Sequence, residues 1–289
     1  MSETHSREEY RARIEQVVTF ITTHLEEPLN LESIAGLSHF SPYHFHRIFT
    51  AVMGETPQDL VNRLRLEKAA NLLLKSTRSV TEIAFACGFS SSSTFARSFK
   101  RHFGISAGAY ARRGLEIIPP LSVQGMPASF TPPEIRMAAM PGLHLATIAD
   151  MRGYALEDIC RAWEKLYRWA CAREFMTNET HMVGISFDDP LITPPEKCRY
   201  YACLSVPQTV GADNLVGVLD IPAARCVVCR ALVPPEHIQL IYRYFYSEWL
   251  PDSGLQPASF PAYEIYYETP ENNSQGKFLM EVCVPVLSL

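Results

Sequence analysis

The apolar positions follow a helical period in the first part of the chain. In residues 9–25, apolar side chains recur at the three- and four-residue spacing of an amphipathic helix. A longer helix is predicted from about Thr56 to about Lys75, with Pro57 at its first position. This part of the chain therefore looks like a set of short helices.

The second part of the chain follows a different pattern. Two longer segments, about 154–173 and 235–250, are predicted to be helices. Between and around them lie short apolar or alternating runs that are typical of strands, at residues 143–149, 200–206, 224–232, 262–268 and 278–286. The fold class expected is multidomain, with an all-α domain followed by an α+β domain.

The two patterns meet at a proline-rich stretch. Residues 117–133 have no helical period and contain five prolines. We therefore predict a helical domain at residues 8–113, a linker at 114–133 and an α+β domain at 134–289. The proline-rich stretch is either the linker alone or a linker that runs into a first edge strand.

The helical domain contains an internal repeat. The segments that start at Glu32 and at Thr81 align at an offset of 49 and, after one inserted residue, of 50. Each copy has a short helix, a turn and a second helix that a glycine ends, which is a helix-turn-helix written twice. The matched positions of the second helices are Phe45, Arg47, Phe49 and Gly54 in the first copy and Phe95, Arg97, Phe99 and Gly104 in the second.

The repeated phenylalanines indicate which face of each second helix meets solvent. They recur every four residues and are expected to face the core, which turns small, polar and basic groups outward. An arginine on such a face can bind guanine O6 and N7 with two hydrogen bonds. The candidate DNA-reading residues are Tyr43, His46, Arg47, Ser92, Ser93, Ala96 and Arg97. The alternative for any one of them is an ordinary solvated helix face.

The helix that joins the two copies has a suggestive length. Its 20 residues from Thr56 to Lys75 span ~30 Å at 1.5 Å per residue. Successive major grooves on one face of DNA are ~34 Å apart. One chain is therefore expected to read two unlike half-sites of double-stranded DNA without dimerising.

Charge supports this expectation only after the chain is divided. The 289 residues have a formal net charge of −5, which argues weakly against a nucleic-acid partner. Residues 41–113, however, carry 11 basic against 4 acidic residues, a balance of +7. The acidic average thus hides a basic module, and a phosphate backbone responds to local charge.

Residues 25–112 resemble the DNA-binding module of the AraC/XylS family of transcription regulators. The resemblance is carried by the run from Ile34 to Phe49 in the first copy and from Val80 to Tyr110 in the second. It implies that both second helices enter adjacent major-groove segments and that the seven residues named above face the bases. A DNA-repair branch of this family has a four-cysteine zinc site ahead of the module, but no cysteine here precedes Cys87.

The α+β domain contains a second repeat. Residues 183–190 align with 263–270, and residues 200–206 align with 280–286, both at an offset of 80. Each copy is predicted to run strand, helix, strand, strand. Two such units side by side would form a pseudo-two-fold sheet with helices behind it and a groove between the units.

Strand alternation suggests candidate pocket residues. The valines of the last strand should pack on the helices, which leaves Glu281 on the other face. In residues 263–268, the alternation leaves Glu264 and Tyr266 free to join it. We therefore expect one concave site for an organic cation, and its candidate residues are Glu281, Glu264, Tyr266, Tyr201 and Trp163, with Tyr167 and Tyr242 closing its ends. The alternative is that the aromatics are core and the carboxylates are solvated.

The eight cysteines are scattered through apolar segments, which favours free thiols over a disulfide framework. Cys226 and Cys229 would face opposite ways on a strand, so we expect neither a metal site nor a redox pair there. No metal and no cofactor are expected.

Residues 134–289 resemble the GyrI-like effector-binding domain found in drug-binding regulators and in the Rob type of AraC-family protein. The resemblance rests on the duplicated unit, on Glu264 and Tyr266, and on the final strand with Glu281. It implies a pocket for amphipathic or aromatic compounds, as in multidrug binding. The domain order is that of the Rob type.

These observations favour a cytoplasmic transcription regulator without catalytic residues. Its expected partners are double-stranded DNA, a small-molecule effector and RNA polymerase, with no membrane, since the chain has a charged start and no apolar run long enough to span one. One alternative is a GyrI-like hydrolase of reactive drug-like compounds, with Glu281 as general acid or base, fused to a DNA-binding module. Another is an inhibitor module whose DNA reader is vestigial.

Overall fold

The computed structural model describes residues 3–38, 40–76, 78–117, 126–127, 129–190, 192–258 and 260–288. The chain divides into two compact units. The helical unit comprises Met1–Ile117, Pro190–Pro194 and Ala212–Gly217, and the sheet unit comprises Ile118–Asp189, Pro195–Gly211 and Val218–Leu289. Each unit is described by itself.

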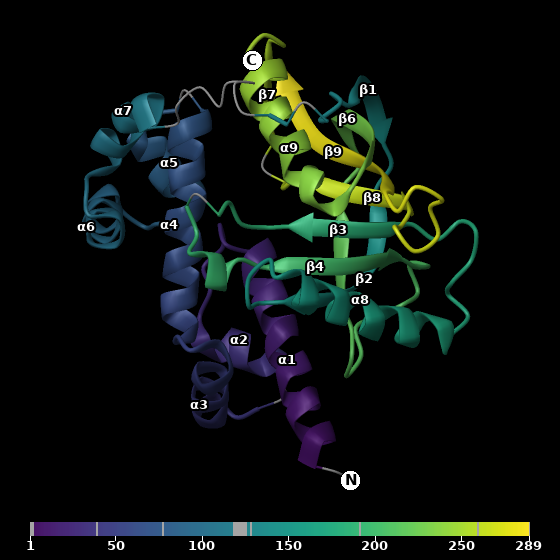
Figure 1. Cartoon of the computed structure of the whole chain (residues 1–289). Helices are drawn as coiled ribbons and strands as arrows, with labels where there is room; N and C mark the ends of the chain where they lie inside the picture. The colour runs from purple at the N-terminus through teal and green to yellow at the C-terminus, as the bar shows by residue number, and fades with distance from the viewer. Residues whose placement is uncertain are drawn as a thin grey trace. The chain divides into compact units, whose positions relative to one another are not determined.

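The helical unit contains two helix-turn-helix copies around a central helix, α4 (Figure 1). The first copy is formed by α2 and α3, and the second by α5 and α6, while α1 and α7 pack at the two ends of the series. The bounds are α1 Glu3–Thr23, α2 Leu31–Leu37, α3 Pro42–Met53, α4 Pro57–Lys75, α5 Val80–Ala86, α6 Ser92–Phe103 and α7 Ala107–Ile117.

The helix ends follow from local chemistry. Thr56 caps α4 by accepting a hydrogen bond from the Asp59 backbone amide at 3.1 Å, and Ser79 forms a capping box with Glu82 at the start of α5. Gly54 and Gly104 end α3 and α6 in the left-handed conformation, with φ of 71° and 77°. The predicted glycine stops are therefore confirmed in both copies.

A close approach at Gly88 ties three segments of the helical unit together. Gly88 follows α5 with φ of +80°. A Cβ there would collide with the Leu25 carbonyl oxygen and lie 2.9 Å from the Arg65 guanidinium carbon. Arg65, from α4, donates hydrogen bonds of 2.8 Å to the carbonyls of Leu25 and Glu27. Only glycine fits this junction between α4, α5 and the segment after α1.

The sheet unit is built from two copies of one motif. The first copy contains β1 Glu134–Met140, β2 Leu143–Asp150, α8 Leu156–Cys171, β3 Met182–Ser186 and β4 Tyr200–Ser205. The second contains β5 Gly217–Ile221, β6 Ala224–Val233, α9 Ile238–Tyr244, β8 Tyr263–Glu268 and β9 Phe278–Ser288. Within the second copy, β7 Leu255–Pro257 lies between α9 and β8 and pairs with β9, and both copies contain short helical turns.

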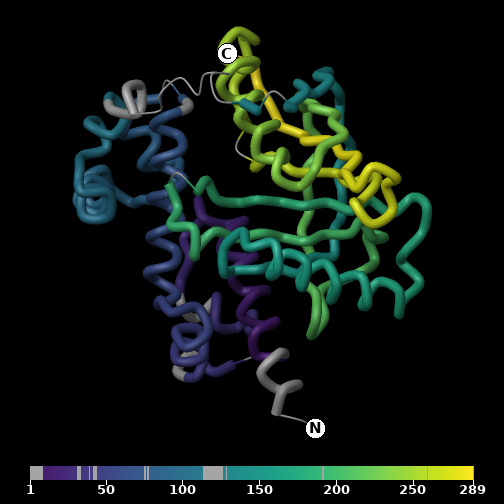
Figure 2. Tube along the Cα trace, in the orientation of Figure 1, coloured from purple at the N-terminus to yellow at the C-terminus, as the bar shows by residue number. Residues whose placement is uncertain are grey.

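The strands of the two copies interleave in one sheet, in the order β1-β6-β9-β8-β3-β4-β2-β5. Strand β1 of the first copy pairs with β6 of the second, and β3 pairs with β8, as Figure 2 shows for the teal, green and yellow segments. In the β3–β8 pair, Gly184 lies opposite Glu264, and these positions are also equivalent in the 80-residue repeat. The pseudo-two-fold axis therefore passes through this pair of residues.

Both faces of the sheet are apolar. One face carries the valines of β9 and packs against α9 and the helical turn that follows it. Ile241 of α9 and Phe245 of that turn are fully buried. Helix α8 packs against β2 and β4. The other face gathers a separate core that includes Tyr201, Tyr263 and Cys283. The predicted helix-facing valines are confirmed, but the opposite face is also buried.

The fold class is as predicted, a helical helix-turn-helix region followed by a strand-rich region with helices, and the details differ in two ways. Each sheet copy has an additional leading strand. Strand β1 is an edge strand directly after the predicted linker, as the sequence suggested, whereas β5 was not predicted. Helix α7 continues to Ile117, into the range predicted as a linker. Most of the rest of that range, residues 118–125 and 128, lies outside the described residues. The domain limits stay a prediction.

In the described part of the chain, no helix is both long enough and apolar enough to cross a bilayer.

Replacing Gly88 by alanine should destabilise the helical unit more than the same change at another left-handed glycine. Gly104→Ala meets nothing within 4 Å, so it should cost only the backbone strain of ~1–2 kcal/mol. Gly88→Ala should cost at least ~1 kcal/mol more, because its Cβ meets a fixed backbone carbonyl. Urea unfolding followed by helical circular dichroism measures both. Equal losses in the two variants would contradict the junction described here.

Candidate functional site

The second helix of each helix-turn-helix buries its phenylalanines. Phe45 and Phe49 of α3 and Phe95 and Phe99 of α6 are all 0% exposed. Within each pair the ring centroids are 5.4 Å apart, so the rings also pack on each other. The four-residue spacing therefore sets the rotation of both helices about their axes.

That rotation exposes most of the predicted DNA-reading residues. His46 and Arg47 are exposed on α3. On α6 the exposed residues are Ser92, Ser93, Ala96 and Arg97. The side chain of Tyr43, the seventh candidate, lies outside the described residues. Helices α3 and α6 lie at opposite ends of α4 and each packs on it, so two polar outer faces are carried by one scaffold (Figure 1).

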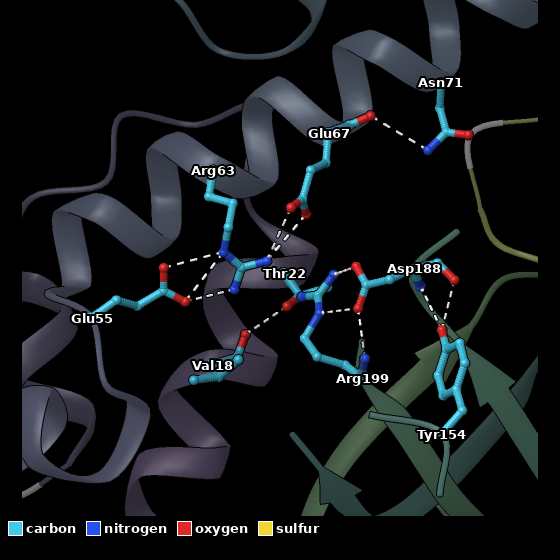
Figure 3. Close-up of polar contacts among 9 residues, drawn as sticks. All are labelled: Val18, Thr22, Glu55, Arg63, Glu67, Asn71, Tyr154, Asp188 and Arg199. Carbon is cyan, nitrogen blue, oxygen red and sulfur yellow. Dashed lines mark hydrogen bonds and ion pairs between the residues drawn. The ribbon is translucent and has the colours of Figure 1, made fainter. Parts of the chain in front are cut away.

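Not every basic residue of the helical unit belongs to these faces. Arg63 of α4 is buried and donates hydrogen bonds to the carboxylates of Glu55 and Glu67, at 2.6 Å and 3.2 Å for the shortest contact with each (Figure 3). Arg65 is used to bind backbone carbonyls, and burial lowers its pKa. The Arg63–Glu67 pair has the four-residue helical spacing, so the sequence did contain a sign of it. Without these two arginines and the two glutamates, residues 41–113 still carry nine basic against two acidic residues, so the balance of +7 is unchanged.

In the sheet unit, a buried carboxylate lies on the helix-covered face. Glu264 of β8 is 3% exposed. Tyr242 of α9 donates a hydrogen bond of 2.8 Å to its Oε1, and Tyr266 donates a short hydrogen bond to its Oε2. In the described part of the chain, no cationic side chain pairs with this carboxylate. A buried anion without a cation is uncommon.

Two further aromatic residues complete this Glu264 cluster, which we define as Glu264, Tyr266, Tyr242, Tyr200 and Trp163. The Trp163 indole N–H donates to the Tyr200 hydroxyl at 3.1 Å. The Trp163 and Tyr266 rings lie edge to face with centroids 6.0 Å apart.

Gly184, opposite Glu264, leaves room for these groups. A Cβ there would lie 2.5 Å from the Tyr200 hydroxyl oxygen and 2.9 Å from Glu264 Oε2. The cluster therefore needs a residue without a side chain at the pseudo-two-fold axis.

A buried ion pair positions the start of the strand that carries Tyr200. Asp188 accepts hydrogen bonds from the Arg199 backbone amide at 2.7 Å and from its guanidinium at 2.6 Å and 2.8 Å (Figure 3). Tyr154 donates to the Asp188 backbone carbonyl at 2.6 Å. Both charged side chains are about 5% exposed or less, so the start of β4 is held firmly.

Burial dominates the electrostatics of the Glu264 cluster. Removal from water raises the pKa of Glu264, and the hydrogen bonds from Tyr266 and Tyr242 oppose this shift without cancelling it. Burial beside the same carboxylate raises the pKa of Tyr242 and of Tyr266. The cluster is therefore a place where added positive charge is favoured.

The expectation of a single concave site was wrong for two residues. Glu264 pairs with Val282 and Tyr266 with Met280 across β8 and β9, so both lie on the helix-covered face. Glu281 pairs with Ile265 and lies on the opposite face. Tyr201 on that face is 0% exposed, and its ring is tilted by 60° against the Phe187 ring with centroids 4.7 Å apart. Alternation could not decide this, because both faces are apolar.

Glu281 differs from Glu264 in its partners. Arg136 and Arg230 donate hydrogen bonds to Glu281 Oε1 at 3.0 Å and 3.1 Å, and Tyr267 donates to Oε2 at 3.0 Å. Burial acts to raise the pKa of Glu281, but the hydrogen bonds from Arg136, Tyr267 and Arg230 together lower it. This carboxylate is fully neutralised by its neighbours.

The structure thus joins three of the five predicted pocket residues and adds two. Glu264, Tyr266 and Trp163 come together, whereas Glu281 and Tyr201 do not join them. One of the two added residues is Tyr242, which the sequence predicted at an end of the site. Tyr200 was missed, although neighbouring Tyr200 and Tyr201 must face opposite sides of a strand.

The cysteine prediction is confirmed as to geometry. Cys226 lies in the core on one face of the sheet and Cys229 in the core on the other. Over the residues that the structure describes, no group of three or more metal-ligating side chains comes together.

Comparison with protein families defines the class of both units. Residues 34–113 match a helix-turn-helix domain of the AraC type, and residues 133–287 match the GyrI-like small molecule binding domain. The second match covers more than half of the chain. The chain belongs to the GyrI-like family, with an AraC-type helix-turn-helix region ahead of that domain.

Curated relatives match part of the chain. The HTH-type transcriptional activator RhaS of Escherichia fergusonii is 42% identical over 95 residues, which is 33% of this chain and 34% of that protein. The uncharacterized HTH-type transcriptional regulator YbfP of Bacillus subtilis is 34% identical over 101 residues, 35% of this chain and 34% of that protein. The right origin-binding protein of Escherichia coli is 29% identical over 150 residues, half of each chain.

The chain thus spans between about a third and a half of the length of these relatives. Both resemblances drawn from the sequence are confirmed, and so is the Rob-type order of domains.

The two carboxylates should affect stability in opposite directions. The folded-state pKa of Glu264 is raised, so its ionised form destabilises the fold, and Glu264→Gln should raise the melting temperature at pH 7. The gain should shrink as the pH falls through that raised pKa.

For Glu281, whose pKa is lowered, the ionised form stabilises the fold, and Glu281→Gln should lower the melting temperature at pH 7. This loss should fade as the pH falls through the lowered pKa. Thermal melts of both variants between pH 3 and pH 8, followed by near-ultraviolet circular dichroism, measure the two effects. A melting temperature at pH 7 that falls in Glu264→Gln and rises in Glu281→Gln would contradict the opposite roles of the two carboxylates.

Proposed function

We propose that this chain is a sequence-specific DNA-binding transcription regulator. The observation that carries the proposal is the repeated exposed face on α3 and α6, with an arginine at the same position of each helix, Arg47 and Arg97. The helix-turn-helix match and the regulators among the relatives support it. Residues 8–113 would bind the DNA, with phosphate contacts for positioning and base contacts for specificity.

In this proposal α3 reads one half-site and α6 reads another. The candidate contacts are His46, Arg47 and Tyr43 for the first half-site. For the second they are Arg97 with the short side chains of Ser92, Ser93 and Ala96. Because the two sets of side chains differ, the two half-sites differ in sequence.

We further propose that a small molecule controls this regulator through residues 134–289. The GyrI-like match supports ligand binding by this domain, and the Glu264 cluster supplies a site with suitable chemistry. A buried carboxylate among aromatic rings favours an amphipathic or aromatic organic cation, including multidrug-type compounds. Ligand control requires that the molecule bind one state of the protein more tightly than another.

The cellular setting follows from this role. A regulator of transcription acts in the compartment that holds the genome, which for the bacterial relatives is the cytoplasm. The relatives named as activators support RNA polymerase as a further partner. No catalytic role is proposed for either unit.

A specific observation disfavours the hydrolase alternative. It requires Glu281 as a general acid or base, which works best with a pKa near the operating pH. The carboxylate of Glu281 is instead held by two guanidiniums and a phenol, and its pKa is lowered.

Replacing Arg97 by alanine should weaken specific DNA binding. On a site enriched from random DNA, the loss of a bidentate guanine contact should lower affinity by ~5- to 150-fold. Affinity for a scrambled sequence should fall far less, since that binding depends on phosphates. Fluorescence anisotropy at fixed salt measures both affinities.

Arg168→Ala provides the matched control, because Arg168 of α8 is 70% exposed and its replacement removes the same charge. It should leave both affinities unchanged. If Arg97→Ala lowered the affinity for the specific site and for the scrambled sequence by the same factor, Arg97 would not read bases.

Replacing Glu264 by glutamine should weaken the binding of a lipophilic cation. With thioflavin T as the probe, whose fluorescence rises when it is held rigid, we expect an affinity loss of about tenfold or more at pH 7.5. Wild-type affinity should also fall as the pH is lowered through the raised pKa of Glu264. The control is Glu157→Gln, since the Glu157 side chain is 91% exposed on α8. Equal affinity of Glu264→Gln and Glu157→Gln for thioflavin T would contradict the proposed cation site.

A further inference from the structure

The face of the sheet opposite the Glu264 cluster carries two arginines that share one carboxylate. Arg136 of β1 and Arg230 of β6 each donate one hydrogen bond to Glu281 Oε1. Their side chains are 46% and 42% exposed, whereas that of Glu281 is 2% exposed. Glu281 therefore anchors both guanidiniums from below, while their outer N–H groups face solvent.

A β-bulge adds an aromatic ring to this pair. The β8–β9 register shifts between Tyr266 and Glu268, which makes Tyr267 the extra residue. Tyr267 donates to Glu281 Oε2 at 3.0 Å, and the Arg230 guanidinium carbon lies 5.2 Å from the centre of its ring. Tyr267 remains 45% exposed. The bulge thus places a phenol ring beside the arginines.

An exposed apolar side chain follows on the same face. Leu232 lies two positions after Arg230 on β6, so it points to the same side of the sheet, and it is 40% exposed. It pairs directly with Leu279 of β9. A charged end and an apolar end therefore lie next to each other on adjacent strands.

We propose that this surface, made of Arg136, Arg230, Tyr267 and Leu232 over Glu281, binds the acidic group of an amphipathic organic anion. The arginines would bind the carboxylate or sulfonate, and Tyr267 and Leu232 would contact the apolar part. The site is distinct from the Glu264 cluster and does not depend on it, since the two lie on opposite faces of the sheet. The domain would then accept ligands of both charge signs.

The donor groups of the two arginines favour an anion at this place. Arg136, Arg230 and Glu281 carry a summed charge of +1, which the exposed Glu134 reduces to zero. Each guanidinium has five N–H donors, and in the described part of the chain its one hydrogen-bond acceptor is Glu281. Planar guanidiniums bind carboxylate and sulfonate oxygens in pairs. Glu134, opposite Arg230 in the β1–β6 register, is exposed and would be the acidic side chain that a ligand competes with.

The experiment uses the full-length protein and the fluorescent anion 8-anilinonaphthalene-1-sulfonate. Its uncharged relative N-phenyl-1-naphthylamine serves as a probe with the same aromatic part. The wild type should bind the sulfonate saturably at one site. Arg136→Gln and Arg230→Gln should each lower that affinity by about tenfold, with little effect on the uncharged probe.

Glu281→Gln separates ligand binding from a purely structural role. It removes the competing negative charge, so it should raise the affinity for the sulfonate even though it lowers the melting temperature. Glu264→Gln tests whether the anion binds at the other cluster instead, and Arg168→Gln is the control, which should bind the sulfonate as the wild type does. All titrations are made at a temperature below the one at which each variant begins to unfold, as judged by circular dichroism.

Four results would overturn the proposal. The first is unchanged sulfonate binding by both arginine variants. The second is an equal loss of affinity for the sulfonate and for the uncharged probe in the arginine variants, which would indicate a damaged fold. The third is weaker sulfonate binding by Glu281→Gln. Loss of sulfonate binding in Glu264→Gln alone would assign the anion to the other cluster and also reject this surface.

Discussion

The burial of two phenylalanines, four residues apart, determines what the second helix of each helix-turn-helix presents to solvent. With Phe45 and Phe49 in one core and Phe95 and Phe99 in the other, neither helix is free to rotate about its axis. The outward faces, and with them Arg47 and Arg97, are therefore a consequence of core packing. The glycine that ends each helix and the rigid α4 between the copies then carry both faces on one scaffold. The specific recognition of DNA that we propose would depend on this arrangement, because base edges are read by side chains held in a fixed direction.

The sheet unit uses duplication differently. Its two copies exchange their first strands and meet at the β3–β8 pair, where Gly184 and Glu264 occupy equivalent positions. A strictly symmetric sequence would place two carboxylates or two glycines at this axis. The actual pair places one carboxylate beside the space that a glycine leaves, and aromatic hydroxyls from both copies fill that space. On the other face, Glu281 is neutralised by two arginines. Two buried glutamates in one sheet thus have opposite electrostatic roles.

The sequence predicted the helical unit well because its signals are local. The proline at the start of α4, the glycine stops and the phenylalanine period act within a few residues, and all of them appear in the structure. The sheet unit was harder, since the choice of face for Glu264 or Glu281 depends on which apolar layer the helices cover. Tyr200 and Tyr201 show the difficulty, as the residue that joins the cluster is the neighbour of the predicted one. The exchange of β1 and β5 between copies is set by long-range pairing, which no local pattern records.

The central claim is that a single chain reads two successive major grooves with α3 and α6. Hydroxyl-radical footprinting tests it directly, with the full-length protein at a 1:1 ratio on DNA enriched from random sequence and with the mass of the complex determined on the same sample. We expect one protein per site and two protected regions on one face of the duplex, about one helical turn of ~10 base pairs apart. The two regions should differ in sequence. A palindromic site occupied by two proteins, or a single protected region, would contradict the account.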